Sequence, residues 1–267
     1  MKTLNKYIHI YFLFFRNCLL SQMEYRLNFF AGIVVDFFFL FDKVIYAFVV
    51  YNLNVSIYGL TPEQVVIFIG SYAIILSIYC AIFLVNINVT LPGNVKSGNL
   101  DIILTKPIST QFYLSTSYVE YATMIPDLFG GIFIVVLACV KMGMSVSFLT
   151  ILGYIFFIII SVVIIYGLYF CIQLLTFYIT DTSAIGGILN SLLDLNNMPM
   201  HVYNKVFRNI FLFVFPVLLF GNLAPLFFIG QLSLTLALWG IFVAVGLIVL
   251  SIVLWRHMVK KYTSING

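Results

Sequence analysis

The chain has 267 residues, of which 63% are hydrophobic and only 8% are charged, about a third of the charged share found in soluble domains. A chain of this composition cannot hide its apolar surface in its own core and must face lipid, which excludes a soluble globular protein. The net charge of +4 is small and reflects loop orientation in a membrane rather than nucleic-acid binding. The four cysteines are scattered without a C-x-x-C pair, so we expect neither a disulfide framework nor a metal site.

The N-terminal segment 1–26 alternates apolar clusters with polar residues. Lys2 and Lys6 resemble the start of a signal peptide, but Arg16 and Asn17 interrupt the apolar run and no A-x-A cleavage site follows. The pattern predicts an amphipathic helix that lies in the membrane interface. The alternative is a cytosolic extension of the first spanning helix.

Long apolar runs then predict an all-α membrane protein with six transmembrane helices, because each crossing needs about 20 apolar residues. One crossing falls within 173–233, where hydropathy favours 208–230 although Pro216 and Pro225 interrupt that stretch. The other crossings are predicted at 27–51, 65–89, 119–140, 148–172 and 234–255.

The basic residues predict the orientation of these helices. With six crossings, most of them fall on one side of the membrane, which is the cytoplasmic side because short cytoplasmic loops are enriched in Lys and Arg. We therefore expect a multi-pass protein of the cell membrane with both termini in the cytoplasm. The residues on this side are Lys2, Lys6, Arg16, Arg26, Lys96, Lys106, Arg256, Lys260 and Lys261.

A polar patch, "NVKSGNLDIILTKPIST" at 94–110, interrupts the apolar sequence on that side. It predicts a short helix from Leu100 to Lys106, with Asn99 as the N-cap and Pro107 as the stop. Leu100, Ile103 and Leu104 would share one apolar face, with Asp101 in the first turn. Because so short a helix is unstable alone, that face must pack on neighbouring helices or the membrane surface, or dock into a groove of a cytosolic partner. Composition leaves these alternatives open.

The stretch "VKSGNLDIILTKPIS" resembles a signature of the ABC-2 family of transporter permeases, in which Gly-x-Leu-Asp and then Leu-x-Lys/Arg-Pro follow the second membrane helix. "YRLNFF" at 25–30 and "YGLTPEQ" at 58–64 are also similar to that family. So is "MPMHVYNKVFRNIFLFVFPVLLFGNLAPLFF", with its spaced prolines. The resemblance covers most of the chain and is strongest to six-helix permeases of about this length that lack a large extracellular domain.

The resemblance implies a single transmembrane permease domain over 1–267, the membrane half of an ATP-driven transporter and more specifically of an exporter. ATP and Mg would be bound by a separate cytosolic ATPase subunit, and a second permease, identical or related, would complete the assembly. The segment 90–117 would be the cytosolic coupling loop, and 202–228 a re-entrant segment that leaves the fifth crossing to 182–198. The residues implied in coupling to the ATPase are Leu100, Asp101, Ile103, Leu104, Lys106 and Pro107.

The chain has no recognisable catalytic motif of its own. A Walker A loop requires G-x-x-x-x-G-K-[ST], and the nearest match, "GNVKS" at 93–97, has Val95 in place of the glycine before lysine. No H-E-x-x-H motif or nucleophile elbow occurs either. We therefore expect a transporter subunit that is not an enzyme and binds no cofactor.

Carboxylates within the apparent spans support an alternative function. Asp36, Asp42 and Asp127 lie in apolar runs, and an intramembrane carboxylate is a functional candidate. They would suit an ion-coupled secondary transporter, with Asp36 the deepest in its helix. Asp42 adjoins Lys43, and pairing with a nearby charge is the simpler explanation for it, whereas the family resemblance would place Asp36 at the contact between two permeases. The pairs Gly130–Gly131 and Gly186–Gly187 predict close helix packing.

Overall fold

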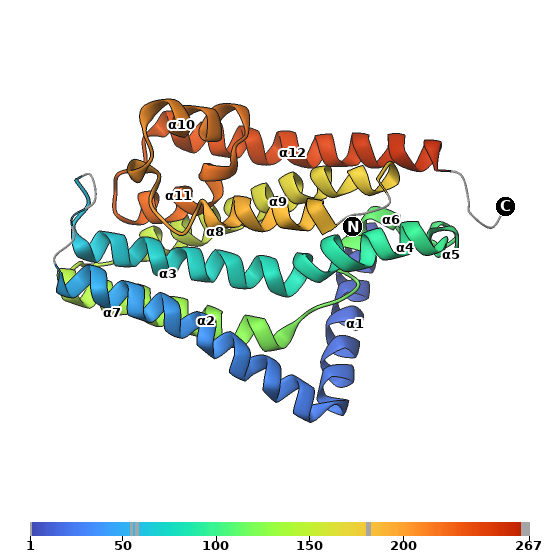
Figure 1. Ribbon diagram of the computed structural model, residues 1–267, viewed down its shortest axis with the longest axis horizontal. Coiled ribbons are helices and arrows are strands. Elements are labelled where there is room, and N and C mark those ends of the chain that lie inside the picture. Colours follow the sequence, from blue (N-terminus) through green and yellow to red (C-terminus); the bar gives the residue numbers. More distant parts are fainter. Residues whose placement is uncertain (1, 54–55, 57–58, 180–182, 263–267) are drawn as a thin grey trace.

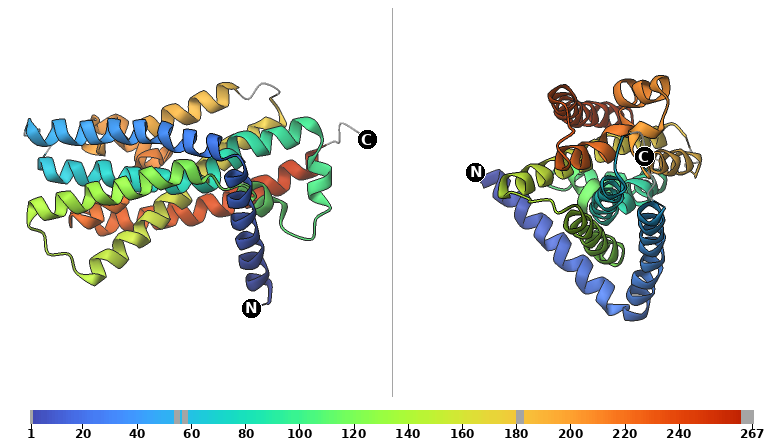
Figure 2. Two further views of the ribbon diagram at one scale, coloured as in Figure 1. Left: turned by 90° about the horizontal axis from the view of Figure 1, so that it is seen from below. Right: turned by 90° about the vertical axis from the view of Figure 1, so that its left-hand side faces the viewer.

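The computed structural model describes residues 2–53, 56, 59–179 and 183–262. This part of the chain is helical and contains no strand, which confirms the predicted all-α class. The long helices run lengthwise beside one another, while α1 crosses them steeply at one end (Figures 1 and 2). The helices are α1 (Lys2–Glu24), α2 (Arg26–Asn52), α3 (Pro62–Tyr79), α4 (Leu91–Ser97), α5 (Leu100–Leu104), α6 (Thr110–Thr116), α7 (Tyr121–Met142), α8 (Phe148–Gln173), α9 (Ser183–Asp194), α10 (Lys205–Asn209), α11 (Val217–Phe228) and α12 (Leu234–Lys261).

Several helices begin at side-chain caps of the kind that the sequence favours. At the start of α3, Thr61 Oγ1 accepts from the Gln64 backbone N–H at 3.4 Å, and the Gln64 side chain accepts from the Thr61 N–H at 3.0 Å. This capping box, with Pro62 in the first turn, satisfies N–H groups that have no partner within the helix. Ser147 and Ser233 cap α8 and α12 in the same way.

Four helical stretches among the described residues are long and apolar enough to cross a membrane: Pro62–Ser97, Met124–Met142, Phe148–Phe177 and Leu234–Lys261. They coincide with the crossings predicted at 65–89, 119–140, 148–172 and 234–255. The first crossing, predicted at 27–51, corresponds to α2, but Asp36, Asp42 and Lys43 lie in its centre and make it too charged to meet the same criterion. The six-helix count is therefore an expectation that the structure supports only for these four.

The stretch before α12 is more irregular than a single spanning helix. The α9 helix has 12 residues, about 18 Å, which is too short to cross a hydrocarbon core of about 30 Å alone. In the stretch predicted at 208–230, the helical stretches Lys205–Val214 and Val217–Phe228 meet at an angle of 98°, so it is not one straight helix. The break lies at Pro216, whereas Pro225 sits inside α11 and breaks nothing. This bent pair is either a broken span or a re-entrant segment.

Glycine allows the closest helix contact in the bundle, between α3 and α7. A Cβ atom added at Gly131 would lie 2.8 Å from the Gly70 carbonyl oxygen, and one at Gly130 would collide with Leu40. The prediction of close packing at Gly130–Gly131 is thus confirmed. Within the described part of the chain, Gly186 and Gly187 make no such contact, because an added Cβ would meet nothing there within 4 Å.

The α1 helix is separate from α2 and not an extension of it, since the two are not collinear (Figure 2). One side of α1 binds the segment around α6: Lys6 Nζ donates to the Pro107 carbonyl at 2.8 Å, and Gln22 Nε2 donates to the Val119 carbonyl at 2.6 Å. Its other side carries exposed apolar residues such as Ile8 and Phe12. This arrangement fits the predicted amphipathic helix.

Candidate functional site

The first candidate site is the end surface formed by α4, α5 and α6. The chain leaves α4 at Gly98, whose φ of 75° is readily adopted only by glycine, and α5 follows at once. Figure 1 shows α4, α5 and α6 at the same end of the molecule as the close of α12. The predicted short helix therefore exists and projects at one end of the bundle.

The predicted docking face of this helix needs correction. Leu100 is fully buried and Ile103 is 6% exposed, so both side chains anchor α5 to the rest of the chain and cannot enter a partner's groove. Ile102 is instead 63% exposed and Leu104 is 36% exposed. Sequence pattern grouped Leu100, Ile103 and Leu104 on one face, but the short helix packs on α4 and α6 through its first and fourth residues. Ile102 was missed, and its apolar character within a polar segment was the available signal.

The ends of α5 also differ from expectation. Asn99 precedes the helix, but its side chain makes no capping hydrogen bond, and the helix ends at Leu104 rather than at Lys106. Lys106 Nζ lies 3.9 Å from the centroid of the Tyr113 ring on α6, a cation–π contact. The Pro107 carbonyl accepts from Lys6. The segment is therefore held in place by α1 and α6 as well as by its own helix.

A buried asparagine joins this end surface to the bundle. Asn86 lies in a π-helical stretch that links α3 to α4, η2 (Asn86–Thr90), which follows a second such stretch, η1 (Cys80–Leu84). Its Nδ2 donates to the carbonyls of Ile82 and Tyr118 at 2.7 and 2.6 Å. Its Oδ1 accepts from Ser117 Oγ at 3.2 Å and from the Tyr118 N–H at 3.1 Å. Asn86 thereby fixes the segment between α6 and α7. Sequence reasoning missed it, although the two asparagines in the apolar run "FLVNINV" were a signal.

The same segment is tied down at two further points. The Glu120 N–H donates to the Ala81 carbonyl at 2.8 Å. Ala81 lies in the π-helical stretch η1, where the regular pattern of backbone hydrogen bonds is altered. The Tyr118 hydroxyl donates to Glu120 Oε2 at 2.9 Å. Burial and this bond to a carboxylate together raise the pKa of Tyr118 to about 12.

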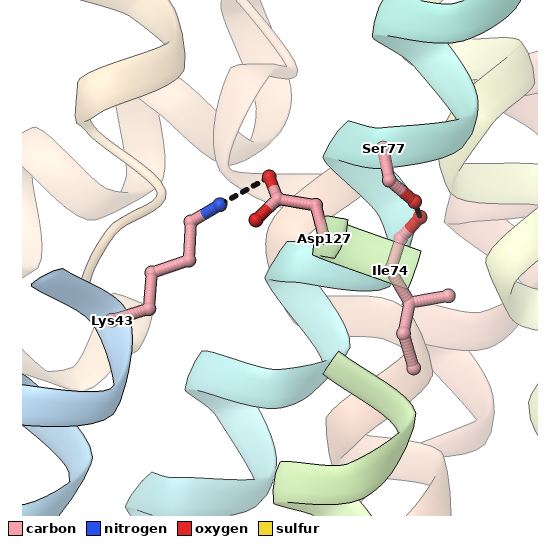
Figure 3. Close-up of polar contacts among 4 residues, drawn as sticks. All are labelled: Lys43, Ile74, Ser77 and Asp127. Atoms are coloured by element: carbon pink, nitrogen blue, oxygen red, sulfur yellow. Dashed lines mark hydrogen bonds and ion pairs between the residues drawn. The ribbon is translucent and has the colours of Figure 1, made fainter. Parts of the chain in front are cut away.

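The second candidate site is a charged cluster inside the bundle. Lys43 Nζ of α2 forms an ion pair with Asp127 Oδ2 of α7, and Figure 3 shows the two side chains pointing toward each other. Lys43 therefore pairs with Asp127, while the neighbouring Asp42 is exposed. Asp36 is 8% exposed and Asp127 is 5% exposed, and each keeps one buried carboxylate oxygen without a hydrogen-bond partner among the described residues.

These charges line a cavity of about 670 Å³ between α2, α3, α7 and the end of α9. Tyr72 on α3 joins the walls, because its hydroxyl donates to the Leu193 carbonyl of α9 at 2.9 Å. No group of three or more His, Cys, Asp and Glu residues in the described part of the chain could hold a metal ion. The lining residues are Asp36, Phe39, Asp42, Lys43, Tyr46, Ile69, Tyr72, Leu76, Ser77, Cys80, Leu84, Asp127, Asn190, Leu193, Asp194, Asn197 and Met198.

Long apolar helices with many exposed apolar side chains define a multi-pass membrane protein. A comparison with protein families is more specific: the model described as "ABC-2 family transporter protein" matches residues 14–266. The chain therefore belongs to the ABC-2 transporter family, which confirms the resemblance found in its motifs and makes it a membrane subunit of an ABC transporter. No curated protein and no solved structure gives a match.

Proposed function

We propose that the chain is the permease subunit of an ABC exporter driven by a separate ATPase subunit. The family match over 14–266 carries this proposal. ATP and Mg would be bound by the cytosolic ATPase, and a second permease, identical or related, would complete the pore. The absence of a Walker A motif from the sequence supports an ATPase site on another chain.

The proposed orientation places the end with α4, α5 and α6 in the cytoplasm. The close of α12, which carries Arg256, Lys260 and Lys261, lies at this end, and α10 lies at the opposite one (Figure 1). Six crossings then result if α2 spans and if the chain crosses once between α8 and α12. Basic residues near cytoplasmic helix ends support this orientation, with both termini inside.

The ATPase would dock on the surface around α5. Ile102 and Leu104 are apolar side chains exposed on a segment that this orientation puts in water rather than in lipid, so covering them is favourable. Leu100 and Ile103 would contribute by fixing the helix in position. Asp101 and Lys106 would set register, because charges at the rim of an interface act on specificity more than on affinity.

Co-purification tests this docking surface. We expect Ile102→Asp combined with Leu104→Asp to leave the permease folded and inserted but to abolish retention of its ATPase partner subunit. The control is Leu53→Asp, which places one such charge on an exposed leucine at the C-terminal end of α2. Normal retention by the double variant, or equal loss in the control, would contradict the proposed surface.

The alternative of an ion-coupled transporter is not favoured by the family to which the chain belongs. It makes an opposite prediction, because transport would then follow a proton gradient in the absence of ATP. We expect the purified chain to hydrolyse no ATP, and substrate movement to require the ATPase subunit. Movement driven by a proton gradient alone and lost in Asp36→Asn would support the alternative instead.

A further inference from the structure

The cavity between α2, α3, α7 and α9 concentrates negative charge to an unusual degree. The chain has nine acidic residues in total, and four of them line this one cavity: Asp36, Asp42, Asp127 and Asp194. Lys43 is the only basic residue in the lining. The cavity wall thus carries an excess of carboxylates, although the whole chain is net positive.

Two of these carboxylates are only partly satisfied by hydrogen bonds in the described part of the chain. Asp36 Oδ2 and Asp127 Oδ1 are buried and accept no hydrogen bond within the described part of the chain. An uncompensated carboxylate is costly at membrane depth, and Lys43 is already engaged with Asp127 through the other oxygen. Asp36 lies about 15 Å along α2 from its Arg26 end and is only 8% exposed, so its side chain faces the bundle rather than the surface.

The rest of the lining fits an organic cation. Phe39, Tyr46 and Tyr72 bring aromatic rings to the wall, and rings attract a weakly hydrated cation through their faces. The volume of about 670 Å³ is in the range of small-molecule sites, about 300–1,000 Å³. Phe39 is also 64% exposed, so the wall that it forms reaches the outer surface of α2.

From this juxtaposition we propose that the cavity binds the cationic group of an amphiphilic organic substrate, with Asp36 as its principal counter-charge. This inference rests on the proposed function, since it names the substrate class of the exporter. The Lys43 ammonium occupies the Asp127 side of the cluster and competes with an incoming cation. Removing Asp36 should therefore weaken cation binding, and removing the Lys43 charge should strengthen it.

Equilibrium binding to the permease alone tests the proposal without involving ATP. The chain is placed in nanodiscs of zwitterionic lipid, which hold no membrane potential, and the displaceable binding of radiolabelled tetraphenylphosphonium is measured. Tetraphenylborate, an anion of nearly the same shape, serves as the matched probe. We expect saturable binding of the cation only.

Three variants test whether the affinity for the cation changes in the expected direction. Asp36→Asn should raise the dissociation constant at least about tenfold, because the carboxylate that would pair with the bound cation is lost. Lys43→Gln should lower it, and Glu24→Gln, which removes an exposed carboxylate on α1 far from the cavity, should leave it unchanged. A purely structural role for the cluster would weaken binding in both cavity variants.

The outcomes are separable. Equal saturable binding of cation and anion, or equal cation affinity in Asp36→Asn and Glu24→Gln, overturns the proposal. If Lys43→Gln fails to fold, the comparison between those two carboxylate variants still decides. Failure here with normal ATPase docking rejects only the substrate class. Cation binding without any ATPase docking would reject the proposed function alone.

Discussion

Asn86 offers the sharpest test of how the end surface is joined to the bundle. We predict that Asn86→Leu, a change of similar volume, loosens the segment between α6 and α7. The substitution removes four hydrogen bonds at 2.6–3.2 Å from a residue that has no exposed surface. The backbone N–H and C=O of Tyr118 both lose their partner, whereas the Ser117 hydroxyl can rotate toward another.

The expected loss of stability follows from two independent estimates. Hydrogen bonds inside membrane proteins average about 0.6 kcal/mol each, so four contribute about 2 kcal/mol. Leaving two partly buried backbone groups unsatisfied costs about 1–3 kcal/mol for each. We therefore expect Asn86→Leu to lower the free energy of unfolding by about 2–6 kcal/mol.

Asn88 provides a matched control two residues further on. Its buried Oδ1 has no hydrogen-bond partner in the described part of the chain, so Asn88→Leu should be neutral or stabilising. Unfolding in mixed micelles by increasing sodium dodecyl sulfate would measure both variants. If Asn86→Leu is no less stable than Asn88→Leu, the four bonds do not hold the segment and our reasoning fails.

Two further predictions concern topology and packing. A cysteine that replaces exposed Lys205, in a background without the four native cysteines, should react with an impermeant maleimide in intact cells. A cysteine that replaces Lys260 should react only after the membrane is opened. The reverse pattern would invert the proposed orientation. Gly131→Ala should lower the free energy of unfolding by about 1–3 kcal/mol, since its Cβ would press on the Gly70 backbone. Gly186→Ala adds a Cβ that faces open space and should leave this free energy unchanged. Equal melting temperatures of the two variants would contradict the close contact of α3 and α7.

Hydropathy and local signals predicted the parts of the fold that depend on local sequence. The spans at 65–89, 119–140, 148–172 and 234–255 were predictable because a crossing needs only length and apolar character. The short helix after Gly98 was predictable from the glycine that precedes it and from Pro107, which follows it. Its exposed face was not, because which side of a five-residue helix is covered depends on α4 and α6.

In the charged cluster, too, some features were predictable from the sequence and others depend on tertiary packing. Sequence identified Asp36, Asp42 and Asp127 as candidates because charge is costly in a span. The partner of Lys43 could not be inferred, since Asp127 is 84 residues away in the chain and meets it only through the packing of α2 and α7. The 12-residue length of α9 was not predicted by hydropathy, whereas the 98° bend falls at Pro216, which the sequence had marked as an interruption.

The two candidate sites are connected through the chain by two short routes. The helix that lines the cavity at Ser77, Cys80 and Leu84 continues without a break to Ser97, just before α5. The segment fixed by Asn86 leads from α6 directly into α7, which carries Asp127. Both routes pass the π-helical stretches at 80–90, where the hydrogen-bond ladder is already altered and a change of register disturbs fewer regular bonds. If the ATPase docks around α5 as we propose, a displacement there would reach the α3 and α7 walls of the cavity together, which is the coupling that an ATP-driven change in cation affinity would require.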